Sequence, residues 1–273
     1  MTKVYRATIE VLTPVHIGIF EFETFSFFEK DGYLYLVDWD KIFKDSLLFE
    51  ELKKVLDKNF ENEEKWFSYF EDEFIKKNKD NILKKDLTQL RIKINKNVNK
   101  DINSLRRNLR FNIRYFNFEK ERYLPYIPGS SLKGVLAKVF SFNRYQTENI
   151  LVSDFYLEDE DKDLTEIFFI QRYYINNSFL KKRSISNLIE MFVPGTRLVG
   201  EIKIIKDINF FINNSLSQEV RNKFNNLLRN GDMRISLGFG IGVSNAKTKY
   251  LVEYNGEKLP LGLAVLSLKE KNG

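Results

Sequence analysis

The sequence predicts an α+β fold of ferredoxin-like, or split βαβ, character. Some segments alternate apolar and polar residues as half-buried strands do, whereas others repeat apolar residues every three or four positions as helices do. Their loose order along the chain is strand, helix, strand, strand, helix, strand, which is the order of a split βαβ unit. With 273 residues, 43% of them hydrophobic, the chain can bury the core of one large domain or two closely packed small ones.

The N-terminal part is predicted to begin with strands. In residues 4–12, Tyr5 and Ile9 belong to an apolar set that alternates with polar residues, which predicts a half-buried strand. "TPVHIG", residues 13–18, then breaks the strand and turns. "FSFFEKDGYLYLVD" predicts a hairpin, because Asp31-Gly32 between apolar runs is a strong hairpin signal.

A helical insertion is predicted from about residue 41 to residue 110. Apolar residues recur there at three- and four-residue steps with charges between them, and residues 76–104 form a more polar section. The charges of this block are best explained as a solvated helix face.

"LPYIPGSSLKGVLAKVF", residues 124–140, predicts a helix start. Pro128-Gly129 turns the chain, Ser130 is placed to cap the helix, and Lys133 adds a positive charge to the first turn. The exposed N–H groups of such a start bind phosphate or carboxylate well, so a plain cap and an anion site both remain open. The residues after Gly134 are not the Lys and Ser or Thr of a phosphate-binding loop, which excludes an ATPase.

The second half is predicted to contain strands around an acidic loop. The carboxylates of residues 158–163 are consecutive and point in all directions, which favours a solvated turn over a metal site. "SISNLIEMF", residues 184–192, predicts a short helix capped by Ser184 or Ser186. A further helix is predicted at 217–231, and strands are predicted at 197–204 and within 233–268, with a turn at Asn255-Gly256.

The glycine-rich stretch "LGFGIGV" follows the last predicted helix. Gly238, Gly240 and Gly242 lack the spacing of a dinucleotide-binding fingerprint and precede a strand pattern, so they indicate a loop. Such a loop lets a nucleic-acid backbone approach closely while Phe239 offers a stacking face. A tight turn or bulge with Phe239 in the core is the alternative.

His16, the only histidine, can be a general base, a phosphate contact or a packed imidazole. No residue near it in the sequence would activate it, which disfavours acid-base catalysis. The chain has no cysteine, which excludes a disulfide scaffold and a thiol nucleophile and, with a single histidine, leaves little basis for a structural zinc site.

The charge distribution predicts a polyanionic partner. The formal net charge is +6, and basic residues gather in stretches such as "LRRNLRFNIR" and "FLKKRS". The N-terminus lacks the unbroken apolar region of a signal peptide, and no window is apolar enough for a membrane span. We therefore expect a soluble, cytoplasmic protein that does not bind membranes.

Several motifs taken together resemble the RAMP superfamily, the repeat-associated subunits of CRISPR effector complexes. Within it the chain is most similar to subunit five of the type III-A (Csm) complex, because "GYLYLVDWDKIF" follows the first turn and "KLPLGLAVLSL" closes the chain. The motifs that carry the resemblance are, in order, "LTPVHIG", "YIPGSSLKGVLAKVF", "EMFVPGTRLVGEIKI" and "RISLGFGIGV".

The resemblance implies two fused RRM-like (ferredoxin-like) modules. The first would comprise residues 1–125, including the helical insertion at about 41–110, and the second residues 126–273. It also implies a non-catalytic crRNA-binding subunit that caps the crRNA 3′ end and supports crRNA maturation and complex assembly in antiviral defence. Its partners would be crRNA, target RNA indirectly, and other Csm subunits, chiefly the backbone subunit, with no cofactor.

The alternatives are another RAMP subunit, in the backbone or at the 5′ tag, and a crRNA-processing endoribonuclease that uses His16. The related backbone subunit cuts target RNA with an aspartate after its first glycine turn, whereas residues 19–30 here contain glutamates and no aspartate. We therefore expect no nuclease activity, no catalytic residue and no metal site. The residues expected to contact RNA are His16, Ser130, Ser131, Lys133, Arg172, Lys181, Lys182, Arg183, Arg234, Gly238, Phe239, Gly240 and Gly242.

Overall fold

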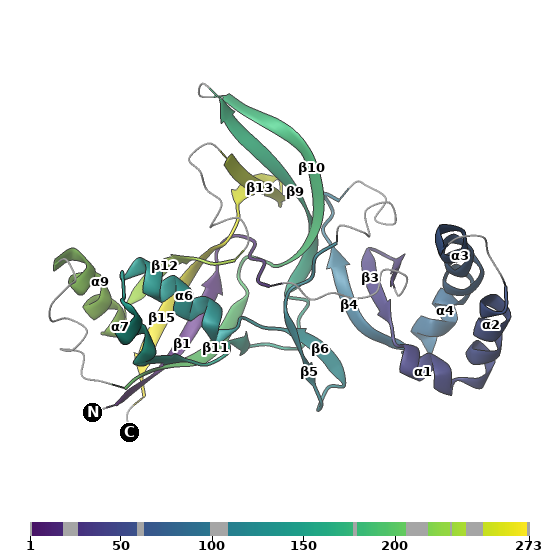
Figure 1. The fold of residues 1–273 in the computed structure, drawn as a ribbon, viewed down its shortest axis with the longest axis horizontal. Coiled ribbons are helices and arrows are strands. Elements are labelled where there is room, and N and C mark those ends of the chain that lie inside the picture. The colour runs from purple at the N-terminus through teal and green to yellow at the C-terminus, as the bar shows by residue number, and fades with distance from the viewer. Residues whose placement is uncertain are drawn as a thin grey trace.

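The fold of the chain was obtained as a computed structural model, which describes residues 2–18, 27–58, 63–98, 109–176, 179–205, 218–229, 231–238 and 248–271. Only the backbone is described for residues 63–64, 67–68, 171–176, 179–187, 221 and 248–249. The described residues form two sheets, a short hairpin and several helices, with the helices α1–α4 at one end and the chain termini at the other (Figure 1). The predicted α+β class is confirmed.

A six-stranded sheet joins the beginning of the chain to its end. Its strand order is β12-β15-β1-β11-β7, with β8 also paired to β11, and β1 runs antiparallel to both β11 and β15. The sheet therefore takes strands from both sides of residue 125, where the boundary between two modules is predicted. Its strands are β1 (Lys3–Val11), β7 (Ile150–Val152), β8 (Tyr156–Leu157), β11 (Arg197–Ile204), β12 (Asp232–Ser236) and β15 (Leu263–Glu270).

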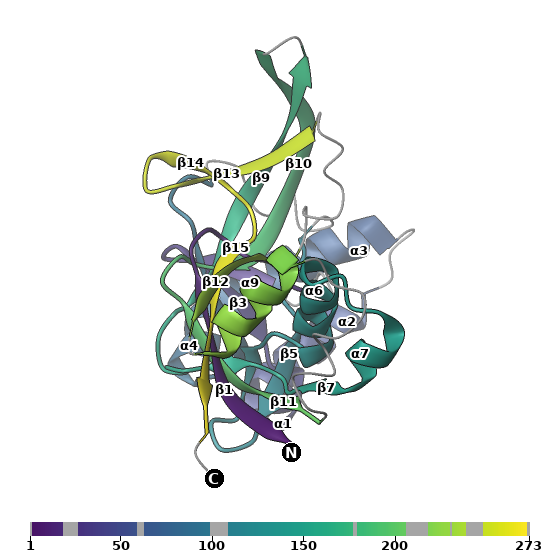
Figure 2. The ribbon, with the colours of Figure 1, turned by 90° about the vertical axis from the view of Figure 1, so that its left-hand side faces the viewer.

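One face of this sheet is covered by helices α6 (Gly129–Val139) and α9 (Gln218–Leu228), which lie in front of it in Figure 2, and α7 (Arg144–Glu148) lies beside β7. The alternation predicted for β1 is confirmed, because its apolar set is buried in the same core as residues of both helices. The core residues that show this are Tyr5, Ala7, Ile9 and Val11 of β1, Leu132 and Leu136 of α6, and Phe224 and Leu227 of α9.

The second sheet has seven strands in the order β14-β13-β9-β4-β3-β2, with β10 also paired to β9. The predicted hairpin is confirmed, because Asp31 and Gly32 have φ angles of 51° and 77° in the turn between β2 and β3. The long β9–β10 hairpin projects from the body of the molecule (Figure 1). The strands are β2 (Phe27–Lys30), β3 (Tyr33–Val37), β4 (Thr88–Ile94), β9 (Thr165–Asn176), β10 (Phe179–Phe192), β13 (Thr248–Tyr254) and β14 (Glu257–Pro260).

The helix predicted at 184–192 is wrong, since these residues belong to β10 and its antiparallel pairing with β9. Leu188, Ile189, Glu190, Met191 and Phe192 are all buried. A strand buried on both faces carries no alternation, so its apolar run cannot be told from a short helix by periodicity.

The helical part of the predicted insertion begins near Trp39 and ends at Lys84. Residues 88–94 form β4 instead of continuing it, and their alternation of Leu90 and Ile92 with polar residues is the strand signal there. The helical elements are α1 (Trp39–Lys44), α2 (Ser46–Leu56), α3 (Glu63–Phe70), a π-helical turn (Glu71–Lys76) and α4 (Lys77–Lys84).

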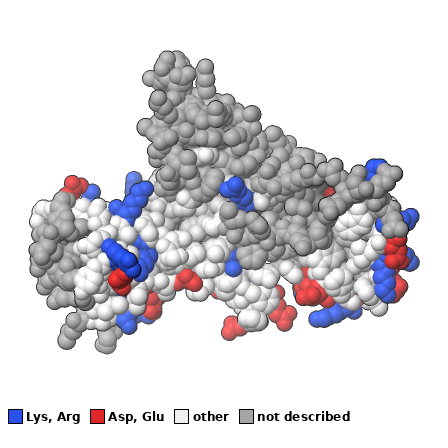
Figure 3. Space-filling view, viewed as in Figure 1, with Lys and Arg blue, Asp and Glu red and all other residues white. Residues whose placement is uncertain are grey.

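Charged side chains of this helical end pair with one another. Lys76 lies 2.6 Å from Asp72 and Lys77 lies 2.5 Å from Glu73, and basic and acidic patches lie side by side over this end in Figure 3. The expectation of a solvated helix face fits these pairs.

Among the described helices, none combines the length and apolar character needed to cross a membrane.

Candidate nucleic-acid interface

Three of the sequence motifs meet at one open hollow of about 450 Å³. "TPVHIG" supplies one wall, the first turns of α6 supply another, and the beginning of the glycine-rich stretch supplies a third. A fourth contribution, from the segment before β5 (Arg114–Asn117), is basic. The lining residues are His16, Ile17, Gly18, Arg110, Ser131, Val135, Leu237 and Gly238.

Backbone contacts hold these segments together. The N–H of Leu237 donates to the carbonyl of Gly262, whose own N–H donates to the carbonyl of Pro14. Gly238 has a φ of +84°, and a Cβ atom at this position would lie 2.0 Å from the carbonyl oxygen of His16. Only glycine combines this left-handed backbone with so close an approach, so the glycine brings the two motifs together.

His16 forms the floor of the hollow and is only 3% exposed. Its Nδ1 lies 2.9 Å from the backbone oxygen of Glu190, which can only accept, so Nδ1 carries the proton and donates. Burial lowers the pKa of His16, although the hydrogen bond to Glu190 opposes this shift. A neutral imidazole held in this way supports the loop, and its burial fits a packed imidazole better than a general base.

The lowered pKa of His16 predicts a loss of stability in acid. The unfolded chain takes up a proton near the ordinary histidine pKa of about 6.5, whereas the folded chain does not until lower pH. The contribution of His16 to the free energy of unfolding should therefore be constant above about pH 7 and fall below about pH 6.5, by at most about 1.4 kcal/mol per pH unit.

Urea unfolding at a series of pH values, followed by circular dichroism, measures this loss. The His16→Asn variant keeps an N–H donor for Glu190 and should show a shallower fall between pH 6.5 and 5.5. Equal slopes for the two proteins would contradict the assignment. Because the chain has one histidine, no other imidazole contributes in this range.

A buried ion pair is connected by hydrogen bonds to the segments that line the hollow. The side chains of Arg114, which opens β5 (Arg114–Asn117), and Glu190 of β10 form a salt bridge and are 1% and 0% exposed. Arg114 also donates to the carbonyl of Tyr123 at 3.1 Å in β6 (Arg122–Pro125). The Glu190 carboxylate also accepts the N–H of Asn112 at 2.9 Å, and the Asn112 side chain accepts the N–H of Ile17 at 3.0 Å. These buried polar contacts tie the loop after β1 to the second sheet.

The start of α6 is capped by a different residue than predicted. Pro128 occupies the N-cap position and no side chain of that position makes a capping hydrogen bond, so the capping role predicted for Ser130 is wrong. The N–H of Gly129 donates instead to the carboxylate of Asp154 at 2.8 Å. A Cβ at Gly129 would lie 2.2 Å from the carbonyl oxygen of Val152, so this glycine is required for the close packing.

A protein carboxylate therefore occupies part of the anion-attracting end of α6. Ser131 faces the hollow, and Ser130 is exposed at the helix start. Lys133 lies two residues beyond Ser131, about 200° around the helix, and is not among the residues of the hollow. Of the predicted residues in this motif, Ser131 alone lines the hollow.

The other predicted residues lie elsewhere. Arg234 is an exposed residue of β12 whose neighbours Met233 and Ile235 face the core, so it belongs to the face of the sheet opposite α6 and α9. On the β9–β10 hairpin, Arg172 stands opposite Arg183 in the register. Lys181 and Lys182 follow the hairpin turn and stand opposite residues 174 and 173. Phe239, Gly240 and Gly242 lie outside the described residues, as do residues 19–26 of the loop compared with the backbone subunit.

Arg110 is the charged residue of the hollow, and the sequence prediction did not name it. It lies in the basic stretch "LRRNLRFNIR", which indicated a polyanionic partner but did not single out one side chain. Its N–H donates to the carbonyl of Leu188, and its carbonyl accepts the N–H of Glu190 at 2.8 Å, so β10 fixes its position. These long-range contacts, which no local pattern predicts, place it beside "TPVHIG".

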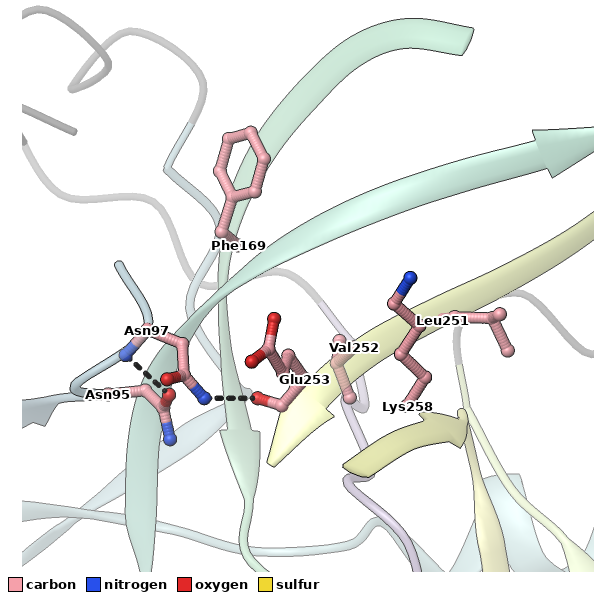
Figure 4. Close-up of a pocket in the computed structure, with 7 residues that line it drawn as sticks. All are labelled: Asn95, Asn97, Phe169, Leu251, Val252, Glu253 and Lys258. Carbon is pink, nitrogen blue, oxygen red and sulfur yellow. Dashed lines mark hydrogen bonds between the residues drawn. The ribbon is translucent and has the colours of Figure 1, made fainter. Parts of the chain in front are cut away.

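A further hollow between β13 and the end of β4 is too small for a nucleotide (Figure 4). Its volume is about 30 Å³, enough for little more than a water molecule. The Asn97 amide donates to the carbonyl of Glu253 at 3.3 Å across it, and the Asn97 N–H donates to the Asn95 side chain.

Within the described ranges, no three His, Asp or Glu side chains are grouped so as to hold a metal ion.

Comparisons with known proteins identify relatives of this fold. The model of the RAMP superfamily matches residues 8–244. No curated protein matches the sequence. Among solved structures, T. onnurineus Csm5 is 14% identical, with a TM-score of 0.53, and the match covers 94% of this chain and 99% of that one. A chain of a Csm-crRNA-target RNA ternary complex of a type III-A system is 16% identical, with a TM-score of 0.47. That match covers 78% of this chain and 66% of the other, just under two thirds of its length.

Proposed function

This chain belongs to the RAMP superfamily, and from that premise we propose that it is a non-catalytic crRNA-binding subunit of a type III-A CRISPR-Cas (Csm) effector complex. The fold that it shares with T. onnurineus Csm5 over most of both chains supports this choice among RAMP subunits. In the proposed role it caps the crRNA 3′ end in a cytoplasmic ribonucleoprotein, contacts the backbone subunit and meets target RNA only indirectly. It would thereby support crRNA maturation and assembly of the complex.

The six-stranded sheet supports an RRM-like module as part of this proposal. In chain order β1, α6, β7, β11, α9 and β15 form a βαββαβ series, and the first strand lies between the third and the fourth. This is the arrangement of a ferredoxin-like unit. Because β1 comes from residues 3–11, we propose that the two modules interleave along the chain rather than divide at residue 125.

The convergence of three motifs on the hollow carries the functional proposal. Arg110 supplies a positive charge, Ser131 a hydroxyl donor, and Gly238 a backbone without a side chain. Such donors recognise phosphate and sugar oxygens rather than bases, so affinity should fall steeply with salt. The proposed RNA path includes the β9–β10 hairpin, whose residues Lys181, Lys182 and Arg183 would contact RNA or a neighbouring subunit.

Removing the charge of Arg110 should weaken crRNA binding about tenfold or more. A hydrogen bond to a charged group contributes about 1.5–3 kcal/mol, and 1.4 kcal/mol corresponds to a factor of ten in the dissociation constant. Fluorescence anisotropy with labelled crRNA, measured for Arg110→Gln at several salt concentrations, tests this. The slope of log affinity against log salt should decrease by about 0.7, the value for one phosphate contact to a single strand.

Arg144→Gln is the matched control, because Arg144 is 94% exposed on α7 and lies outside the hollow. Equal affinities for the two variants, with unchanged melting temperatures, would exclude the hollow as the RNA site.

The same labelled crRNA incubated with wild-type protein and Mg²⁺ should stay intact, because the proposed subunit is not catalytic. Cleavage of the crRNA that the His16→Asn substitution abolishes would favour the processing enzyme instead.

A further inference from the structure

A second, larger hollow contains a basic site that an acidic segment of the same chain occupies. We call it the β4 cleft. It has a volume of about 650 Å³ and lies between β4, the β5–β6 hairpin and residues 158–163, the acidic segment. The cations that line it and contact the acidic segment are Arg91 of β4 and Lys120 and Arg122 of the hairpin.

Each of these cations binds a carboxylate of the acidic segment. Arg91 Nη2 lies 3.1 Å from both oxygens of Asp163. Lys120 Nζ lies 2.7 Å from Asp161 and 3.4 Å from Glu160. Arg122 lies 3.4 Å from Asp161 and also donates to the backbone oxygen of Glu160. The segment predicted to be a solvated turn is therefore held by three cations of the cleft, and Glu158 at its start also pairs with Arg197 and Arg6 outside the cleft.

Neutral donors complete the set. The hydroxyl of Tyr33 donates to Asp163 at 3.3 Å, and the hydroxyl of Tyr115 donates to Glu160 at 3.1 Å. The Asn117 amide donates to the other oxygen of Glu160 at 3.2 Å. The Arg91 guanidinium lies 4.7 Å from the centre of the Tyr33 ring. Cations, hydroxyls, an amide and aromatic faces are the groups with which proteins bind the backbone and bases of single-stranded RNA.

The contacts of the acidic segment are suited to exchange. Asp161 is 81% exposed, and Arg91 and Arg122 are about half exposed, so water screens these pairs. Residues 158–164 form neither helix nor strand. Backbone hydrogen bonds fix the two ends of this stretch, where Glu158 donates to Arg197 and Leu164 accepts from Val193, so the exchange concerns residues 160–163 between them. Arg114 also lines the cleft, but its pairing with Glu190 is fully buried, and it would keep this partner.

The cleft is also close to the proposed RNA site. Arg110 lines the first hollow and Arg114 lines the β4 cleft. Four residues span at most about 14 Å, since an extended chain advances by about 3.3–3.6 Å per residue. One RNA strand that lies at Arg110 is therefore within reach of the cleft.

We propose that the β4 cleft is a second binding site for RNA phosphates, and that the acidic segment is a built-in competitor that RNA displaces. This inference rests on the proposed RNA-binding function. The carboxylates of Glu160, Asp161 and Asp163 stand where phosphate oxygens would bind. By competing for the same cations, the segment lowers the affinity for short, nonspecific RNA and leaves the site to RNA anchored elsewhere on the protein.

The test compares the variant Glu160→Gln/Asp161→Asn/Asp163→Asn with a charge-matched control, Glu219→Gln/Asp232→Asn/Glu257→Gln, whose changes lie outside the cleft. Binding of fluorescein-labelled oligouridine is measured by anisotropy. The cleft variant should bind roughly tenfold more tightly than the control. Adding Arg91→Gln and Arg122→Gln should remove that gain and decrease the salt slope by about 1.4, twice the value for one contact.

Equal affinities of the cleft variant and the control would overturn the proposal, as would a gain that persists without Arg91 and Arg122. A folding defect cannot imitate the expected result, because it would weaken binding. The proposal would also be wrong if an oligoglutamate peptide displaced the segment whereas oligouridine did not crosslink to Tyr33 or Tyr115. The cleft would then bind an acidic protein instead of RNA. The Arg110→Gln measurement tests the proposed function separately, so loss of this inference leaves that result unaffected.

Discussion

Replacing Glu190 by glutamine is expected to lower the free energy of unfolding by about 3–5 kcal/mol. The substitution keeps the shape of the side chain but leaves the buried Arg114 guanidinium without its counter-charge. An uncompensated charge in a buried position costs about this much, because it has lost its hydration and gains no partner. Urea unfolding of wild type and Glu190→Gln, followed by far-ultraviolet circular dichroism, measures the difference.

Glu158→Gln is the control for this experiment. Glu158 pairs with Arg197 at 3.0 Å, but both side chains are substantially exposed, so its loss should cost less than about 1 kcal/mol. The double variant Arg114→Met/Glu190→Gln removes the stranded charge and should recover part of the loss. A Glu190→Gln protein as stable as the Glu158→Gln control would show that the buried Arg114–Glu190 pair does not stabilise the fold.

Substituting alanine for Gly238 is expected to cost about 2–5 kcal/mol and to weaken RNA binding. The left-handed backbone of this residue costs a non-glycine residue roughly 1–2 kcal/mol. The added Cβ would also meet the carbonyl oxygen of His16 at 2.0 Å, and forcing extra atoms into packed structure costs about 1–3 kcal/mol more. Because this oxygen belongs to the backbone, the clash can be relieved only if the walls of the first hollow move apart.

Gly256→Ala separates the two contributions. Gly256 has a φ of +86°, almost that of Gly238, but a Cβ there would meet nothing within 4 Å. The Gly256→Ala variant should lose only the unfolding free energy that the left-handed backbone costs, and its affinity for crRNA should be unchanged. Equal losses of unfolding free energy for the two variants, or an unchanged affinity of Gly238→Ala for crRNA, would contradict the close contact between the two motifs.

Glu190→Gln and Gly238→Ala change contacts to the same part of the structure, the loop that contains His16. Glu190 holds residues 110–114 and the His16 loop from the second sheet, and Gly238 closes against the same loop from the first. The hollow thus lies where the two sheets meet. Its geometry depends on the buried contacts of Glu190 and Gly238, so the free energy of unfolding and the affinity for RNA are expected to decrease together.

Local patterns predicted much of the fold. The alternation in β1, the Asp31-Gly32 hairpin, the start of α6 near Gly129 and the Asn255-Gly256 turn are all present in the structure. Each depends on residues that are near neighbours in the chain, and their side chains alone favour one backbone conformation. Where a segment is buried on both faces, as in β10, this local signal is lost and the predicted helix was wrong.

The candidate site was predictable in its motifs but not in its geometry. The order of "TPVHIG", "YIPGSSLKG" and "LGFGIGV" indicated the RAMP superfamily and named His16, Ser131 and Gly238. It could not show that Lys133 and Arg234 lie away from the hollow or that Arg110 lines it. The contacts of a side chain beyond its own helix or strand depend on how the elements pack.

By itself, then, the sequence determined the α+β class, the family and the segments that carry the motifs. Only the tertiary structure decided that Asp154 caps α6, that Arg114 pairs with Glu190, and that the acidic segment lies in a basic cleft. The physical reason is the range of the interactions. Periodicity and turn chemistry act over a few residues, whereas these partners lie 25 to 76 positions apart and meet only after the sheets have assembled.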